Sequence, residues 1–157
     1  MGVNSSRVRS QLDTDASVTL RATGGSDITS DTIATPVTLN ELRTAFWHGK
    51  EIPAGLLALN VIVTKADTGG TNAYAIGVVV DDVVAMNDSP VEIAKYTLTP
   101  GTLGHYKFVI DAKMIPKLDV DVSGTGKYIA TKGYASGNGT PKLNYYAWLS
   151  KSGKAAV

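Results

Sequence analysis

The stretch LLALNVIVTKADTGGTNAYAIGVVVDD, residues Leu56–Asp82, decides the fold class of this chain. Alternate side chains of a strand point to the same face, so alternating apolar residues predict a strand with a buried face. The alternating apolar positions are Leu57, Leu59, Val61 and Val63 in the first half and Tyr74, Ile76, Val78 and Val80 in the second. The segment KADTGGTNA between the halves has the glycines of a hairpin or short loop. We therefore expect two strands that pair with each other.

The same pattern continues on both sides of this stretch. Short runs with strand character recur at a spacing of roughly ten residues, and turn residues separate them, as in a sandwich or barrel. These runs are SVTLRA from Ser17, VEIAKYTLT from Val91, HYKFVIDA from His105, KYIATKGYA from Lys127 and KLNYYAWLS from Lys142. The glycines within residues 136–140 let the fourth run reverse into the fifth. The chain is predicted to be all-β, a sandwich or a barrel.

One short helix interrupts the strands, in TLNELRTAFWHGK. Thr38 and Glu41 form a capping box, and Gly49 stands where a left-handed cap would end the helix. The apolar stripe at helical spacing consists of Leu39, Leu42 and Phe46. A stripe this short favours a plug over one end of a β core. The alternative is a helix that exposes Phe46 and Trp47 to a partner.

Length and composition indicate one domain. The 157 residues are 43% hydrophobic, enough for a core without disulfides, and there is no cysteine. We expect a mobile polar arm at residues 1–16, the sandwich at 17–150 and a flexible tail at 151–157. A net charge of +1 gives no field that would attract nucleic acid or an anionic membrane. No apolar run resembles a signal peptide or a membrane span, so we expect a protein made in the cytosol.

Candidate catalytic and metal-binding patterns fail on their spacing. The Gly126-Lys127 pair is followed by Tyr128, where a phosphate loop needs Ser or Thr. A calcium loop beginning at Asp119 would end at Ala130, without the carboxylate that closes such a site. We predict that the chain is not an enzyme and binds no cofactor or metal.

The histidines and the one pair of neighbouring aspartates also indicate no catalytic or metal site. His48 and His105 have no second ligand at metal-binding spacing. The neighbours Asp81 and Asp82 end a strand, so their carboxylates point to opposite faces and do not form a dyad.

The aromatic residues leave an alternative open. They are Trp47, Tyr74, Tyr96, Tyr106, Tyr128, Tyr134, Tyr145, Tyr146 and Trp148. Such residues can form a platform on which sugars stack, as on lectin-like sandwiches. Most alternate in phase with the strands, so we expect them mainly in the core. A carbohydrate- or receptor-binding module remains the alternative function.

The order of segments resembles one known family. A polar arm is followed by LLALNVIVTKADTGGTNAYAIGVVVDD, VEIAKYTLTPGTLGHYKFVI, MIPKLDVDVSGTGKYIATKGYA and TPKLNYYAWLS. Residues 17–150 thereby resemble the jelly-roll capsid cement, or decoration, proteins of tailed bacteriophages. The last two segments carry most of the likeness, through Pro116, Lys127-Tyr128 and Thr140-Pro141. The arm and the helix of Thr38–Trp47 are longer than that family leads us to expect.

The resemblance implies a structural virion protein on the outer surface of a phage head, made in the host cytoplasm. Such proteins bind as homotrimers and tie neighbouring major capsid proteins together. Arg7 and Arg9 in the arm, with Phe46 and Trp47 on the helix, are the residues we expect to contact the capsid or another subunit. Affinity for such a lattice comes from many copies and repeated geometry.

Overall fold

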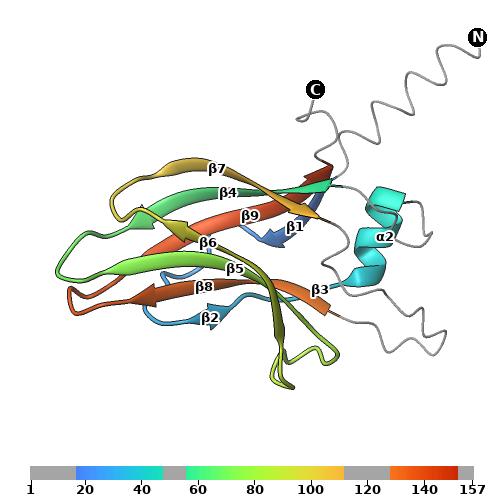
Figure 1. The fold of residues 1–157 in the computed structure, drawn as a ribbon, viewed down its shortest axis with the longest axis horizontal. Coiled ribbons are helices and arrows are strands. Elements are labelled where there is room, and N and C mark those ends of the chain that lie inside the picture. Colours follow the sequence, from blue (N-terminus) through green and yellow to red (C-terminus); the bar gives the residue numbers. More distant parts are fainter. Residues whose placement is uncertain (1–16, 48–55, 112–127, 152–157) are drawn as a thin grey trace, which may run out of the picture.

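The fold is a sandwich of two antiparallel β-sheets in a computed structural model that describes residues 17–47, 56–111 and 128–151 (Figure 1). The first sheet has the order β1 (Ser17–Arg21), β9 (Leu143–Lys151), β4 (Leu56–Ala66), β7 (Gly104–Asp111). The second sheet has the order β2 (Thr32–Ile33), β8 (Tyr128–Ser136), β5 (Ala73–Asp81), β6 (Val91–Leu98), and β3 (Val37–Thr38) also pairs with β8. The predicted all-β sandwich is confirmed.

The strand order is that of a jelly roll. The chain changes sheet between β1 and β2, between β3 and β4, and at each later connection except the one that joins β5 to β6. The short strands β2 and β3 both pair with β8, so the nine strands occupy the eight positions of a jelly roll, four in each of two facing sheets.

This topology corrects the one pairing predicted from the sequence. The runs of Leu56–Ala66 and Ala73–Asp81 do not pair, because β4 lies between β7 and β9 and β5 lies between β6 and β8. The last two runs, β8 and β9, also lie in different sheets. The physical reason is that β4 and β5 each have a fully apolar face. Facing each other across the core buries both, whereas a hairpin would place both faces on one side of a single sheet.

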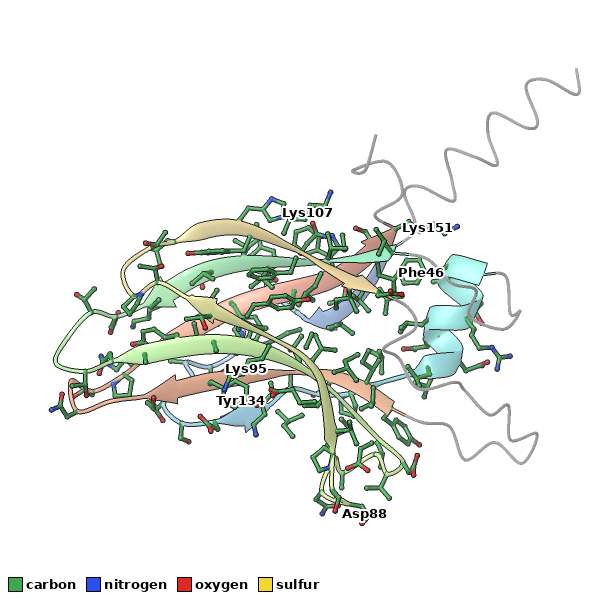
Figure 2. The ribbon with its side chains drawn as sticks, viewed as in Figure 1. Phe46, Asp88, Lys95, Lys107, Tyr134 and Lys151 are labelled. Carbon is green, nitrogen blue, oxygen red and sulfur yellow. The ribbon has the colours of Figure 1, made fainter. Side chains whose placement is uncertain are left out.

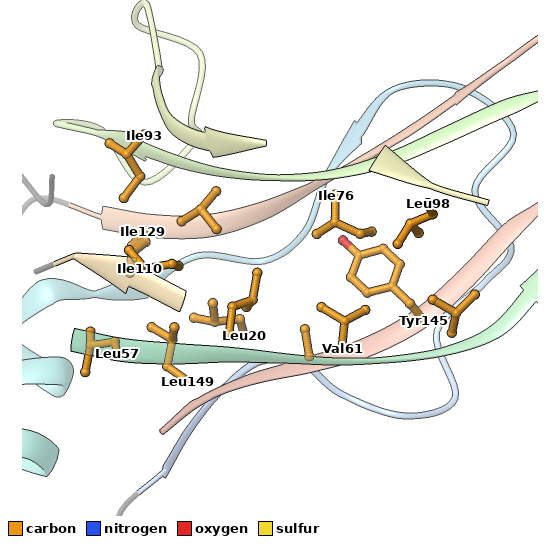
Figure 3. Packing of buried hydrophobic residues seen from close by; sticks show 14 of the residues in the cluster. Leu20, Leu57, Val61, Ile76, Ile93, Leu98, Ile110, Ile129, Tyr145 and Leu149 are labelled. Carbon is orange, nitrogen blue, oxygen red and sulfur yellow. The ribbon is translucent and has the colours of Figure 1, made fainter. Parts of the chain in front are cut away.

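The core fills the space between the two sheets (Figure 3). Leu57, Val61 and Leu149 enter it from the first sheet, and each is at most 1% exposed. Ile76 and Ile129 enter it from the second sheet with the same burial. The in-phase positions read from the sequence therefore mark the core correctly in both central strands.

Helix α2 (Leu39–Trp47) closes one end of the sandwich (Figure 1). Thr38 Oγ1 accepts a hydrogen bond from the Glu41 amide at 3.2 Å, as the predicted cap requires. Leu39 and Leu42 are fully buried, which confirms the plug. Phe46 is only 1% exposed, so its predicted role as a capsid or subunit contact is wrong. The helical period places it on the buried stripe.

At the other end, the β4–β5 and β8–β9 loops are joined by hydrogen bonds. The Thr71 amide donates to Asn138 Oδ1 at 2.9 Å, and the Gly139 amide donates to Asn72 Oδ1 at 2.9 Å. A Cβ on Gly139 would lie 2.3 Å from the carbonyl carbon of Gly69. The glycines of this turn therefore have the geometric role that the sequence indicated. They let two loops from different sheets approach closely.

Candidate binding surface

The aromatic side chains divide between the core and the outer faces of the sheets. Tyr74 and Tyr145 are buried, at 2% and 1% exposure, and Tyr96, Tyr106 and Phe108 are half-buried and pack against the core. Tyr134, Tyr146 and Trp148 are half-buried on the outer faces. Tyr145 and Tyr146 are consecutive, so the pleat must send them to opposite faces. Aromatic content alone could not tell which member of the pair is internal.

A group of these side chains gathers on the outer face of the first sheet. We call this surface the aromatic face, and it comprises Leu56, Asn60, Ile62, His105, Lys107, Val109, Tyr146, Trp148 and Ser150. The register aligns these residues in rows across β9, β4 and β7. One row contains Tyr146, Ile62 and His105. Among the described residues, no helix or strand packs over these rows.

Three rings form the centre of the aromatic face. Trp148 lies 5.8 Å from the His105 ring and 6.0 Å from the Tyr146 ring, measured between centroids. The interplanar angles are 24° and 18°, so the three rings share one orientation. Trp148 and His105 belong to strands on either side of β4. Their contact therefore crosses β4 and links three strands with one strip of rings.

A polar group lies among these rings. Asn60 is only 5% exposed although it points to the outer side of the sheet. Its Nδ2 donates to Ser150 Oγ at 2.9 Å, and its Oδ1 lies 3.2 Å from His105 Nε2. Both ends of the amide have hydrogen-bond partners, so the burial of Asn60 leaves no unsatisfied polar group. The hydrogen bonds hold His105 in position beside Trp148.

Exposed aliphatic side chains extend the aromatic face toward the helix end. Leu56 is 44% exposed and Val109 is 52% exposed. Lys107 points outward on the same side (Figure 2). Rings and exposed aliphatics with few charges are the composition found at the centre of protein interfaces.

The outer face of the second sheet differs. Lys95 Nζ lies 4.0 Å from the centre of the Tyr134 ring, and Lys132 Nζ lies 4.7 Å from it. The Tyr134 hydroxyl donates to Glu92. Loss of solvent, followed by the neighbouring Glu92 carboxylate, raises the pKa of Tyr134 to about 12. Lys95 and Tyr134 lie together on this side in Figure 2. The ring is already occupied by cations, so this face is charged where the aromatic face is apolar.

The remaining predicted site residues are placed as follows. Asp81 is 6% exposed, and its carboxylate accepts hydrogen bonds from the amides of Asp82 and Asp88 at 2.6 and 3.0 Å. It therefore organises the β5–β6 loop. Asp82 is exposed, so the two carboxylates point apart as expected. His105 is exposed and contacts Asn60 and Trp148.

Several other expectations fall on parts of the chain that lie outside the described residues. They are Arg7, Arg9, the side chain of Trp47, His48, the 119–127 segment and the arm and tail boundaries. Within residues 17–47, 56–111 and 128–151, no group of three or more potential ligands could hold a metal ion. In the same ranges, no helix has the length and apolar character needed to cross a membrane.

Comparison of the sequence with protein-family models and with curated proteins finds no match. The likeness to capsid cement proteins thus remains a prediction from the sequence.

Proposed function

We propose that this protein is a capsid cement protein that binds the outer surface of a phage head as a homotrimer and clamps neighbouring major capsid proteins. The observation that carries the proposal is the aromatic face. It is a row of rings and exposed aliphatics on one outer side of a jelly roll, the fold that the family likeness implied. Fold alone does not give a function, so the support comes from this surface.

The composition of the aromatic face suits a protein partner. Tryptophan and tyrosine contribute most to binding energy where they lie near the middle of an interface and are surrounded by contacts that exclude water. Trp148 and Tyr146 are central in the sheet, and Leu56 and Val109 lie beside them.

The size of the aromatic face explains why a second contact is needed. β7 pairs with β4 over eight positions, so the three strands β9, β4 and β7 cover a projected area of about 400 Å² at the usual strand spacing and rise. A stable interface buries about 800 Å² on each partner. The face therefore supplies roughly half of what one specific attachment requires. Trimerisation and the N-terminal arm are the sources we propose for the rest.

Co-sedimentation with phage heads lacking this protein tests the proposal. We expect the unsubstituted chain to sediment with the heads, and Trp148→Ser combined with Val109→Ser to bind at least tenfold more weakly. Tyr134→Ser is the matched control, since it removes a half-buried ring from the opposite sheet, and it should bind normally. Failure of the unsubstituted chain to bind, or equal binding by the double variant, would refute the proposal.

A second candidate function is favoured by the ring geometry. Trp148, Tyr146 and His105 lie side by side with interplanar angles of 24° and 18°, next to the half-buried hydroxyl of Ser150. Rings with adjacent hydrogen-bonding groups suit the apolar faces and hydroxyls of a sugar. A glycan array separates the two functions. The carbohydrate-binding module would replace the cement protein as the function if two results were found together. The chain would bind a defined sugar and lose this binding in Trp148→Ala, and it would not bind phage heads.

A further inference from the structure

A groove of about 530 Å³ lies between β1 and helix α2. Its apolar lining consists of Val18, Val37 and Ala45, which are half-buried and pack against the core. Its polar rim includes Thr19, Glu41 and Thr44, all exposed. An apolar floor with a polar rim suits a peptide segment that buries a few small side chains and keeps its polar groups wet.

One wall of the groove is the open edge of a sheet. β1 is the outermost strand of the first sheet, and in the described part of the chain it pairs only with β9. Every second amide and carbonyl of Ser17–Arg21 therefore points away from β9, toward the groove side. Such an edge accepts an added strand, whose main-chain hydrogen bonds provide affinity. The five residues offer an edge of about 17 Å.

We propose that the groove between β1 and α2 receives the N-terminal arm, residues 1–16, of a neighbouring copy of this chain, as a strand added beside β1. The occupant follows first from charge. Glu41 is the one charged residue that lines the groove, and the distal part of the arm carries Arg7 and Arg9. Arginine beside an exposed carboxylate can form a charge-assisted hydrogen bond.

The arm of a neighbour fits better than the chain's own arm. The arm joins β1 at Ser17, so returning along β1 would require a tight hairpin turn just before that residue. Two-residue hairpin turns need residues that tolerate positive φ, above all Asn-Gly, Asp-Gly or Gly-Gly. The preceding segment RSQLDTDA contains neither glycine nor asparagine. This composition favours the groove of another copy over the chain's own groove as the place that receives the arm.

The arm is also long enough to reach another copy. With residues 6–10 paired to β1, so that Arg7 and Arg9 lie in the groove, the six residues 11–16 span about 20 Å when extended. A domain of 157 residues has a diameter of about 39 Å, so the arm reaches a copy whose groove lies within about half a diameter of Ser17. Each copy gives one arm and receives one, so such contacts run head to tail and fill every groove only when the ring closes. The arm exchange rests on the proposed function only for the number of copies in the ring, which is three. The exchange itself needs no capsid.

Cross-linking of full-length chains tests this exchange directly, since the natural sequence has no cysteine. One chain carries Val8→Cys in the arm, and a second, tagged chain carries Thr44→Cys on the groove rim. After co-refolding and treatment with a short bis-maleimide, we expect a mixed product as the main cross-linked species. The matched control places the second cysteine at the exposed Thr102→Cys, in the β6–β7 loop at the far end of the sandwich. It should give at least tenfold less mixed product.

Two results would overturn the exchange. One is a mixed yield no greater than that of the Thr102→Cys control. The other is a Val8→Cys/Thr44→Cys chain that cross-links within itself at high dilution, which would show that each groove holds its own arm. Because no heads are present, the test is separate from the test of the proposed function. If the chain cross-links as expected but does not bind heads, the arm exchange is supported and only the proposed cement function is refuted.

Discussion

The buried hydrogen bond between Tyr145 and Thr131 gives the sharpest test of the core. The Tyr145 hydroxyl lies 2.9 Å from Thr131 Oγ1, and the pair joins β9 in the first sheet to β8 in the second. Tyr145 is 1% exposed and Thr131 is 0% exposed. Figure 3 shows the Tyr145 ring lying between the sheets. The two substitutions to make are Tyr145→Phe and Thr131→Val, singly and together.

Each single substitution removes one partner and leaves the other polar group buried without its bond. An unsatisfied buried donor or acceptor costs about 1–3 kcal/mol of unfolding free energy, whereas replacing both partners by apolar groups of similar shape is close to neutral. We therefore expect each single variant to lose about 1–3 kcal/mol, a fall in Tm of roughly 2–12 °C for a chain of this size. The double variant should lose no more than the worse single variant. The coupling energy should then be at least about 1 kcal/mol.

Urea unfolding of all four proteins, followed by tryptophan fluorescence and far-UV circular dichroism, measures this cycle. Equal m-values across the set are required, so that midpoint shifts report stability and not a changed unfolded state. Losses that simply add in the double variant, or single variants within about 0.5 kcal/mol of the unsubstituted chain, would refute the reasoning. Either result would mean that the hydroxyl pair is not a closed buried bond.

Four further outcomes are expected. Phe46→Ala should cost about 3–5 kcal/mol in urea unfolding, since it empties a buried position under the helix plug; a loss below about 1 kcal/mol would show an exposed side chain. Gly139→Ala should cost more than Gly25→Ala, because a Cβ at Gly139 meets the Gly69 backbone whereas a Cβ at Gly25, which has no positive φ, meets only the far end of the Arg21 side chain; equal losses would argue against the joined loops. Burial raises the pKa of Tyr145 above its unfolded value of about 10. The folded state then keeps a proton that the unfolded state releases, so stability is complete below that pH and falls as pH rises through the folded pKa. Urea midpoints of Tyr145→Phe should therefore decline less steeply between pH 9 and 11, and parallel declines would contradict this. Finally, deleting residues 1–16 should leave the Tm of the separate chain at low protein concentration nearly unchanged but weaken attachment to heads and their resistance to heat. A truncated chain that protects heads as well as the full one would show that the arm is passive.

The two sets of aromatic residues show what strand patterns can and cannot locate. Tyr146 and Trp148 were already candidates for a sugar-stacking platform, and the expectation that the aromatics lie mainly in the core holds for one part of the set, Tyr74 and Tyr145 with Tyr96 and Tyr106 packed against them, but not for Tyr134, Tyr146 and Trp148. A usable signal was present in KLNYYAWLS, where Tyr145 is in phase with Ala147 and Leu149 while Tyr146 and Trp148 are out of phase. No such sequence pattern indicated that Asn60, His105 and Val109 belong to the aromatic face. They join the aromatic face because β4 lies between β9 and β7 in the sheet, although β7 and β9 are far apart in sequence.

The sequence by itself determined the longer strands, the helix and the core positions of the central strands, but not the two-residue strands β2 and β3. Period-2 alternation and turn residues located β4, β5 and β9, and the capping box with its apolar stripe located α2, because these signals act between residues close in the chain. Only the tertiary structure decided which strands are neighbours. The pattern around Gly69 and Gly70 allows either a hairpin or a crossing to the opposite sheet. The chain crosses to the opposite sheet because this buries the apolar faces of β4 and β5 against each other. The hydrophobic effect that favours this burial is non-directional and depends on the packing of the whole domain, so no local pattern encodes it. The same global packing placed His105 beside Trp148 and left the groove beside β1 open.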